Sequence, residues 1–391
     1  MEKLGLGVVG LGRGFMLTLP ALQAHPAVRL VAAFDLRADA LLRFAEEFGG
    51  EAHTSLERLL ADERVDAVYI ATPHELHAQQ AIAALQSGKH VLVEKPMATS
   101  VADCAAMAAA ARAAGRVLVV GPSHGFDEQV RLAADLAASG RFGRVRMVTT
   151  FNFTDFMYRP RRAEELDSSR GGGVVYSQAA HQIDVVRRLI GQPVASVRAI
   201  AGNWDVGRPS EGAYTALMTF TGGAAASLTY SGYAHYDSDE LVGWISELGS
   251  AKDNSLYGAA RRKLDGMDQS AEDSAKLSRT YGGSRGVAAH PAHHEHFGFV
   301  IVSCERADLK LLPTGIEIYG DEERSFVPIP PPTIPRAAVI DEFVGAIRGD
   351  RVAVHDGSWG LVTMACCDAI LQSSRKSAEI DPMTIISAPT A

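Results

Sequence analysis

Long apolar runs are missing from this chain of 391 residues, although hydrophobic residues make up 47% of it and charged residues 21%. A membrane-spanning helix needs about 18 consecutive apolar residues, and no window of the sequence approaches that length. We therefore expect a globular protein with no membrane partner. The chain passes from Met1-Glu2-Lys3 straight into its first apolar run, so no signal peptide is expected.

Cysteine and excess positive charge are also scarce. The four cysteines are Cys104, Cys304, Cys366 and Cys367, at spacings that fit neither a disulfide framework nor a zinc site. This use of cysteine is typical of a reducing compartment, and we predict a cytoplasmic location. The net charge of -8 argues against a nucleic-acid partner, because nucleic acids attract basic surfaces.

The length predicts two domains, because single hydrophobic cores seldom grow beyond about 250–300 residues. In the N-terminal third, apolar runs alternate with helix-like stretches. The predicted strands are 4–9, 29–34, 67–71, 90–93 and 116–120, and the predicted helices are 15–24, 38–48, 75–86 and 101–114. This alternation predicts a doubly wound parallel sheet, and so an α/β domain.

After about residue 125 the apolar pattern changes to period two, as in Val145, Met147, Thr149, Phe151 and Phe153. Further strands are predicted at 194–201, 213–220, 224–233, 297–304 and 315–319, with helices at 178–190, 337–347 and 359–371. We predict a C-terminal α+β domain with an open, mostly antiparallel sheet. The predicted domains are 1–124 and 125–391, with the polar stretch 250–290 as a surface excursion.

A glycine-rich turn follows the first predicted strand. Gly10 permits a tight turn, and Gly12 lets the backbone approach a dinucleotide pyrophosphate, which the N-terminus of the next helix stabilises. The third glycine of the usual fingerprint would stand at Phe15, whereas Gly14 comes one residue earlier. The sequence therefore does not decide whether the helix and the strand are in close contact here.

An acidic residue, Asp35, ends the second predicted strand. Asp35 is placed to accept hydrogen bonds from the adenosine ribose hydroxyls, and its charge would repel a 2′-phosphate. We therefore predict NAD as the cofactor, while Arg37 leaves NADP open. The alternative for Asp35 is a helix cap.

A lysine follows the fourth predicted strand, in the sequence Glu94-Lys95-Pro96. Ligands of open α/β sheets bind outside the carboxyl ends of the strands, so Lys95 would face the same crevice as the glycine-rich turn. There it is a candidate for proton transfer in a nicotinamide-dependent oxidoreductase. The alternative is a solvated lysine at a strand end.

These motifs resemble the glucose–fructose oxidoreductase / inositol dehydrogenase family, abbreviated Gfo/Idh/MocA. The matching residues are Gly10-Leu11-Gly12-Arg13, Ala71-Thr72-Pro73 with His74 and His77, Glu94-Lys95-Pro96, and Gly171-Gly172-Gly173 followed by His181 and Asp184. The resemblance implies an N-terminal Rossmann domain and a C-terminal domain with an open sheet. It also implies a homo-oligomer, a dimer or tetramer, formed through the C-terminal sheet.

The resemblance further implies roles for single residues. The expected cofactor-binding residues are Gly10, Gly12, Arg13, Gly14, Phe15, Asp35, Arg37, Thr72, Pro73, His77, Glu94, Lys95 and Pro96. Lys95 is identified as the catalytic lysine, whose pKa would fall beside a cationic nicotinamide, and its bond to Pro96 is expected to be cis.

His181 is the second catalytic candidate, because an imidazole titrates near neutrality and can relay a proton. A structural histidine on a helix is the alternative. Family members that act on polyols often carry an aspartate four residues earlier, where this chain has Ser177. That departure counts against sugar substrates, and Ser177 could hydrogen-bond a substrate hydroxyl instead.

A narrower branch of the family is also similar, the branch that oxidises the 4,5-cis-dihydrodiol of phthalate with NAD. The similar segments are Thr150-Phe151-Asn152-Phe153-Thr154-Asp155, Tyr158-Arg159-Pro160-Arg161-Arg162, Ser177-Gln178-Ala179-Ala180-His181-Gln182 and His293-His294-Glu295-His296-Phe297-Gly298. The product of such an oxidation is an aromatic diol acid, 4,5-dihydroxyphthalate.

Three arginines follow Tyr158 in a chain of net negative charge. Arginine pairs with carboxylates in a planar, bidentate way, so Arg159 and Arg162 are the predicted anchors for a substrate carboxylate. The alternative is a solvated loop in which they pair with Glu164, Glu165 and Asp167. The other predicted substrate-binding residues are Asn152, Asp155, Tyr158, Ser177, His181, His293 and His296.

Four histidines, His290, His293, His294 and His296, are clustered in the sequence. Clustered imidazoles can bind zinc, but no carboxylate or cysteine completes a familiar spacing and hydride transfer to NAD needs no metal. We therefore expect no metal, and we place one or two of these histidines in the substrate pocket.

The sequence thus predicts an NAD-dependent dehydrogenase of a cyclic cis-dihydrodiol carboxylate. One alternative keeps the fold and changes the substrate to a sugar, inositol or sugar acid. Another is NAD-dependent glycoside hydrolysis, in which hydride transfer is transient. The non-enzymatic alternative, an NAD-sensing or scaffold protein, would need neither Lys95 nor His181.

Overall fold

The computed structural model describes residues 3–233, 235–284 and 291–387. Their contacts form two compact units. The first unit holds residues 3–122, 273–284 and 334–364, and the second holds most of the remainder. The predicted division at residue 124 stays a prediction. Within the described ranges, no helix combines the length and the hydropathy that crossing a membrane requires.

The first unit is built on a parallel sheet of six strands in the order β3-β2-β1-β4-β5-β6. The strands are β1 (Leu4–Val9), β2 (Val28–Phe34), β3 (Glu51–His53), β4 (Ala67–Ile70), β5 (His90–Val93) and β6 (Leu118–Val120). Most are almost fully buried, as expected for parallel strands covered on both faces. The predicted doubly wound sheet is confirmed. Strand β3 was not predicted, because it is short, partly exposed and has no apolar run.

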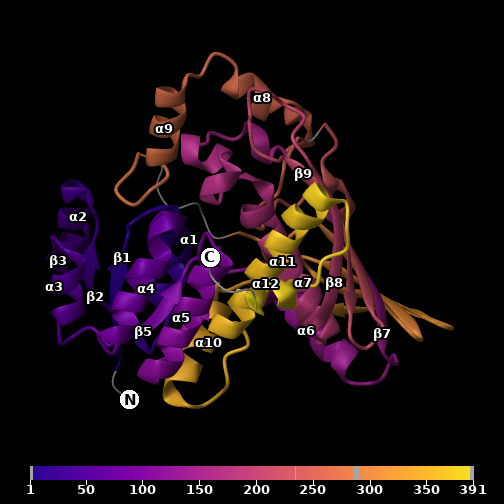
Figure 1. Cartoon of the computed structure of the whole chain (residues 1–391), viewed down its shortest axis with the longest axis horizontal. Helices are drawn as coiled ribbons and strands as arrows, with labels where there is room; N and C mark the ends of the chain where they lie inside the picture. The colour runs from indigo at the N-terminus through magenta and orange to yellow at the C-terminus, as the bar shows by residue number, and fades with distance from the viewer. Residues whose placement is uncertain (1–2, 234, 285–290, 388–391) are drawn as a thin grey trace. The chain divides into compact units, whose positions relative to one another are not determined.

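Helices cover this sheet (Figure 1). They are α1 (Arg13–Ala24), α2 (Ala38–Phe48), α3 (Leu56–Ala61), α4 (His77–Gln86), α5 (Val101–Ala114) and α10 (Ala337–Arg348). Helices α4 and α5 pack against each other, and α10 packs against α1. The strand order reverses between β1 and β4, which places a ligand crevice at the carboxyl ends of these strands.

The second unit contains a sheet of eight strands in the order β14-β13-β12-β11-β7-β10-β9-β8. They are β7 (Val145–Phe153), β8 (Val194–Gly202), β9 (Ala213–Phe220), β10 (Ala225–Ser231), β11 (Phe299–Cys304), β12 (Ala307–Leu312), β13 (Gly315–Gly320) and β14 (Arg324–Pro328). Strands β7 and β10 pair in parallel, and the other neighbours pair antiparallel. The predicted mostly antiparallel sheet is confirmed.

Helix α7 (Ala180–Ile190) packs on strands β7 and β10 and also against helix α6 (Glu128–Ala138). Gln182 holds α7 to the sheet, because its fully buried amide accepts a hydrogen bond from the Tyr214 hydroxyl at 2.5 Å. The same amide donates to Thr150 and to the carbonyl of Thr229. A buried polar group left without a partner costs about 1–3 kcal/mol, so this network fixes where α7 lies on the sheet.

The remaining helices are α8 (Ala259–Leu264), α9 (Gln269–Leu277), α11 (Gly357–Lys376) and α12 (Pro382–Ser387). Helices α8 and α9 lie in the stretch 250–290, which was predicted as a surface excursion and for which no helix was predicted. Both are short, and their amphipathic pattern is too brief to stand out in a polar segment. Residues 285–290 of that stretch lie outside the described residues.

Candidate active site

The glycine-rich turn after β1 lies against the turn after β4. Gly10 has a φ of +90°, and a β-carbon there would stand 2.9 Å from the backbone carbonyl carbon of Ala71. Only glycine fits this conformation and this approach. Gly12 begins helix α1 with no side-chain cap, and a helix N-terminus of this kind suits an anion such as a pyrophosphate.

Gly14 provides the close packing of helix and strand that the third glycine of the fingerprint usually allows. A β-carbon at Gly14 would lie 2.6 Å from Oε1 of Glu94, at the end of β5, so glycine permits the close approach of helix α1. Phe15 is fully buried, with its ring 5.4 Å from that of Tyr281. The side chain of Phe15 is therefore part of the core, and only its backbone is placed to serve a cofactor. Arg13 is exposed.

Asp35 and Arg37 anchor the glycine-rich turn. Asp35 Oδ2 accepts from the N–H of Leu11 at 2.7 Å, and Oδ1 accepts from the N–H and the Nε of Arg37. Arg37 itself is the N-terminal flanking residue of α2, so Asp35 is not the cap of that helix. The guanidinium of Arg37 also donates to the carbonyls of Leu11 and Tyr281 and to the Thr280 hydroxyl.

This arrangement bears on the choice between NAD and NADP. All three guanidinium nitrogens of Arg37 are engaged by protein oxygens, so a 2′-phosphate would have to displace one of these contacts. The glycine cradle, the open helix N-terminus and the carboxylate at the end of β2 all fit a dinucleotide.

The turns after β4 and β5 are joined by a buried histidine. His77 Nδ1 lies 3.0 Å from the carbonyl oxygen of Pro96, and Nε2 lies 3.0 Å from that of Thr72. Burial lowers the pKa of His77, although the two carbonyl contacts oppose that shift. His77 therefore positions the turns that carry Thr72-Pro73 and Lys95-Pro96.

Lys95 is partly buried, and its bond to Pro96 is cis, as expected. Its neighbour Glu94 is buried and accepts a hydrogen bond of 2.6 Å from the Tyr69 hydroxyl. Burial raises the pKa of Glu94. Glu94 thus packs inward beneath helix α1.

In the second unit, His181 lies in the first turn of α7. The turn is preceded by a π-helical segment (Val175–Ala179), a distortion that is frequent at functional sites. The Nδ1 atom of His181 lies 3.3 Å from the Ser123 hydroxyl. Its ring packs on Phe297, with the centroids 4.9 Å apart.

Ser177 and Asp184, which flank His181 in the sequence, form hydrogen bonds with backbone groups. The Ser177 hydroxyl donates to the carbonyl oxygen of Gly173, so towards a substrate it can act only as an acceptor. Asp184 accepts from the N–H of Gly125 at 3.0 Å. It therefore fixes the turn beside His181.

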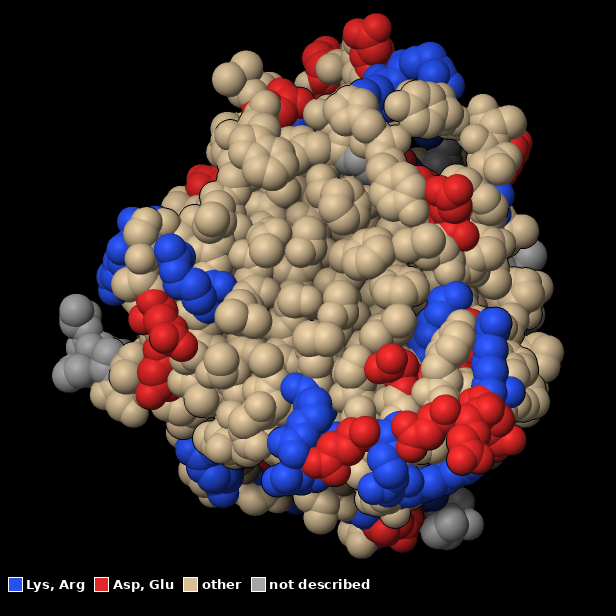
Figure 2. Space-filling view, turned by 90° about the vertical axis from the view of Figure 1, so that its right-hand side faces the viewer, with Lys and Arg blue, Asp and Glu red and all other residues tan. Residues whose placement is uncertain are grey.

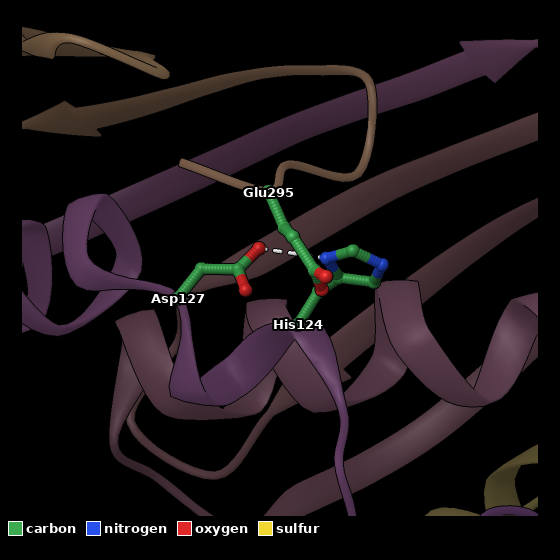
Figure 3. A group of neighbouring side chains, drawn as sticks. All are labelled: His124, Asp127 and Glu295. Carbon is green, nitrogen blue, oxygen red and sulfur yellow. Dashed lines mark hydrogen bonds and ion pairs between the residues drawn. The ribbon is translucent and has the colours of Figure 1, made fainter. Parts of the chain in front are cut away.

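That turn brings in a histidine that the sequence analysis missed. His124 packs edge to face on His181, with the ring centroids 4.7 Å apart. Its Nδ1 is hydrogen-bonded to Asp127 Oδ2 at 2.7 Å, and Glu295 approaches the same ring (Figure 3). The signal was present, because a histidine and an aspartate three residues apart follow the last predicted Rossmann strand.

The carboxylates around His124 oppose the effect of burial on its pKa. Burial opposes protonation, but the carboxylates of Asp127, Glu295 and Glu247 outweigh it and raise the pKa of His124. Burial likewise raises the pKa of Asp127, although His124 opposes that shift.

The predicted substrate residues at the end of β7 form a polar network in which Asn152 is buried and Asp155 is partly exposed. Asn152 is fully buried, donates to Glu247 Oε1 at 3.3 Å and accepts from the Ser238 hydroxyl at 3.1 Å. Arg159 pairs with Asp155 at 2.7 Å and with Glu247 at 3.4 Å. Burial opposes ionisation of Glu247, but Arg159 prevails and lowers the pKa of that carboxyl group.

The rest of the arginine segment is held by local partners. Tyr158 donates to Asp205 at 2.9 Å, and Arg162 Nε lies 3.2 Å from Glu164 Oε1 and 3.6 Å from Glu165 Oε2. For Arg162 the structure therefore has the local pairing that was the alternative to substrate binding. Its side chain is 43% exposed, although the Nε atom itself is buried.

The clustered histidines separate into different roles. Both ring nitrogens of His296 are used by backbone groups, Nε2 by the carbonyl of Ile245 and Nδ1 by the N–H of Gly298. This geometry leaves neither nitrogen for a substrate. His294 Nε2 is hydrogen-bonded to the carbonyl oxygen of Pro330, and His293 is partly buried. His290 lies outside the described residues.

Comparison with known proteins identifies both parts of the chain. Residues 4–122 match a model described as an oxidoreductase family with an NAD-binding Rossmann fold, and residues 130–248 match the GFO/IDH/MocA C-terminal domain. The predicted NAD-binding Rossmann domain is thereby confirmed.

Relatives of the whole chain are also found. A 1-carboxy-3-chloro-3,4-dihydroxycyclohexa-1,5-diene dehydrogenase of Comamonas testosteroni is 45% identical over 377 residues, which are 95% of this chain and 94% of that protein. A solved structure from Bordetella bronchiseptica RB50, assigned as a dehydrogenase, is 39% identical with a TM-score of 0.91 and covers 97% of this chain and 100% of its own. The WlbA dehydrogenase of Bordetella pertussis, solved with NADH and UDP-GlcNAcA, is 24% identical with a TM-score of 0.70 over 100% of both chains and shows the fold alone.

We predict that Asp35→Ser narrows the preference for NAD over NADP, measured as the ratio of kcat/KM for the two cofactors. The serine removes the charge that repels a 2′-phosphate and releases Arg37 from its ion pair. Loss of a charged interaction of this kind changes the ratio of kcat/KM for NAD and NADP by about tenfold or more. Asp39→Asn, an exposed substitution in the first turn of α2, is the matched control. An unchanged ratio would make Asp35 a purely structural residue.

Proposed function

Because the chain belongs to the GFO/IDH/MocA family of NAD-dependent oxidoreductases, we propose that its substrate is a cyclic cis-dihydrodiol carboxylate. The carrying observation is the Comamonas testosteroni relative, whose named substrate is a dihydroxycyclohexadiene with a carboxyl group and which matches 95% of this chain. As the specific substrate we propose the 4,5-cis-dihydrodiol of phthalate, which would be oxidised to 4,5-dihydroxyphthalate.

Oxidation of a carbinol removes a hydride from carbon and a proton from oxygen. When bound, the nicotinamide supplies the hydride acceptor, and the protein supplies orientation and a base. We assign proton acceptance from the substrate hydroxyl to Nζ of Lys95, on the turn that His77 positions. His181, with its Nδ1 beside the Ser123 hydroxyl, is the second residue to which we assign proton transfer.

The altered position Ser177 supports a diol acid over a sugar. Its hydroxyl donates to a carbonyl and carries no charge, so the aspartate that often assists the histidine in polyol dehydrogenases has no counterpart at this position. A dihydrodiol needs less assistance, because its ketone product gains aromatic stabilisation on becoming a catechol. The oxidation is therefore pulled forward by the next step.

For the substrate carboxylates we propose Arg162 and Arg159 as anchors. Both guanidinium groups are already paired with protein carboxylates, so a substrate carboxylate would share them. Arg162 is the stronger candidate, since its side chain is more exposed than that of Arg159. Bidentate pairing with a carboxylate is the property that favours arginine here.

We also propose that the chain forms a homo-oligomer through the eight-stranded sheet. Figure 2 shows a broad face with few charged residues, with Lys, Arg, Asp and Glu gathered mainly at its margins. Exposed apolar side chains on these strands include Met147, Ile200 and Leu217. Apolar patches of this kind mark protein interfaces.

The substrate proposal is tested by following NADH absorbance with the 4,5-cis-dihydrodiol of phthalate, inositol and glucose. NADH formation with the dihydrodiol alone is the expected result. Formation with a polyol alone would contradict the substrate assignment, and the oxidoreductase assignment would stand.

Lys95→Ala is expected to lower kcat by about 10²–10⁴-fold while NAD still binds, because one proton-transfer group is lost and the glycine cradle is untouched. Titration of the protein with NADH, followed by fluorescence, measures the binding. Lys376→Ala, an exposed lysine of α11, is the control and should leave both quantities unchanged. Unchanged turnover in the Lys95 variant would remove this lysine from the mechanism.

The oligomer is tested by light scattering coupled to gel filtration. The expected mass is a multiple of 41.6 kDa, and Leu217→Glu on β9 should reduce it by placing a charge in the interface. Leu42→Glu, an exposed position on α2, serves as the control. A monomeric wild-type protein would refute the proposal.

A further inference from the structure

Two histidines from distant parts of the chain lie ring against ring in the second unit. His124 comes from the turn after Ser123, and His181 comes from the start of α7. Their centroids are 4.7 Å apart with the planes at 69°, and Phe297 packs on both rings. A group at the reacting part of the substrate beside His181 would therefore be near His124 as well.

His124 has the arrangement of an oriented base. Asp127 binds its Nδ1 at 2.7 Å, which fixes the tautomer and directs Nε2 away from the carboxylate (Figure 3). Within the described part of the chain, the hydrogen bonds of His124 involve Nδ1 and leave Nε2 without a protein partner. A buried carboxylate on one nitrogen stabilises the imidazolium that forms when the other nitrogen takes a proton.

The reaction proposed above requires more than one proton transfer. Hydride loss and loss of the hydroxyl proton convert one carbinol into a ketone. The neighbouring ring carbon still carries a hydrogen and a hydroxyl group, so the ring is not yet aromatic. Formation of the catechol needs this hydrogen to leave carbon as a proton, while the ketone oxygen gains a proton.

We propose that His124, held by Asp127, carries out this second proton transfer, an inference that rests on the proposed function. Nε2 takes the proton from the ring carbon as the C–H bond breaks, a ring C=C bond forms and the electrons of the ketone C=O bond move onto oxygen. The imidazolium then returns the proton to that oxygen. One C–H bond and one C=O double bond are exchanged for one C=C double bond and one O–H bond, and no co-reactant is consumed.

The surroundings of His124 suit a group that both accepts and returns a proton. Asp127, Glu295 and Glu247 are the acidic groups that act on it, and His181 is the titratable ring packed against it. Together the carboxylates raise the pKa of His124, so its conjugate acid is stable enough to form by removal of a carbon-bound proton.

The experiment separates the two steps by stopped-flow spectroscopy, with NADH absorbance reporting hydride transfer and catechol absorbance reporting aromatisation. The probe is the 4,5-cis-dihydrodiol of phthalate with the full-length protein and NAD. In His124→Gln we expect catechol to form at least about tenfold more slowly than NADH during the first turnover, so that its signal lags behind the NADH signal. His294→Gln, whose ring is bonded to the carbonyl of Pro330, is the matched control and should show no lag.

Asp127→Asn provides a second variant that keeps the imidazole and removes its charged partner. A shorter lag than in His124→Gln supports the dyad. Simultaneous appearance of NADH and catechol in His124→Gln would overturn the inference while leaving the proposed function intact. Absence of NADH from the wild-type protein would overturn both.

A metal role for the same side chains is the remaining outcome. One ligand atom from each of His124, Asp127 and Glu295 lies within 4.8 Å of the others. Loss of catechol formation after EDTA treatment, with recovery on adding Zn²⁺, would show that these side chains bind a metal. That result would refute the inference. Rates that are insensitive to EDTA support it.

Discussion

Close backbone approach at the carboxyl edge of the parallel sheet is the constraint on which the first unit depends. The turn after β1 can lie against the turn after β4 only because Gly10 has no β-carbon, and glycine at position 14 leaves room for the side chain of Glu94 beneath helix α1. Asp35 then holds this turn through the N–H of Leu11, and His77 joins the turns that follow β4 and β5. A rigid edge of this kind fixes where a cofactor and Lys95 can meet, which is the main contribution a protein makes to hydride transfer.

The second unit uses a different means of fixing its functional groups, a set of buried hydrogen bonds on one face of a sheet. Gln182 joins α7 to Tyr214, Thr150 and the backbone of β10, and Asn152 joins the end of β7 to Glu247 and Ser238. Polar groups buried in this way are costly unless every one has a partner, so they specify one arrangement more sharply than apolar contacts do. His181 inherits its position from this network, since it directly precedes Gln182 in the same helix.

Sequence patterns predicted most of the elements that bury continuous or alternating apolar residues, but they missed helix α6 and strands β12 and β14. They also failed where an element is short or its role depends on distant partners. Strand β3 and helix α3 are too short to show a period, and helices α8 and α9 lie in a polar stretch. The glycine-rich turn, Asp35 and Lys95 could be placed, because a parallel sheet brings the ends of its strands to one edge. Glu247 and Glu295 could not, since their proximity to His124 joins segments more than 100 residues apart, and nothing local in the sequence encodes it.

Charge in the second unit also constrains how a diol acid would bind. The ring of His124 is surrounded by the carboxylates of Asp127, Glu295 and Glu247, which would repel a carboxylate and accept hydrogen bonds from hydroxyl groups. Arg159 pairs with Glu247 on one side and with Asp155 on the other, so a guanidinium shared by two carboxylates lies next to this acidic region. A substrate with hydroxyls at one end and carboxylates at the other gains from both regions in only one orientation, with the diol toward the histidines. A neutral polyol has no such preference. Such an orientation would place the diol of the proposed substrate beside His124 and His181.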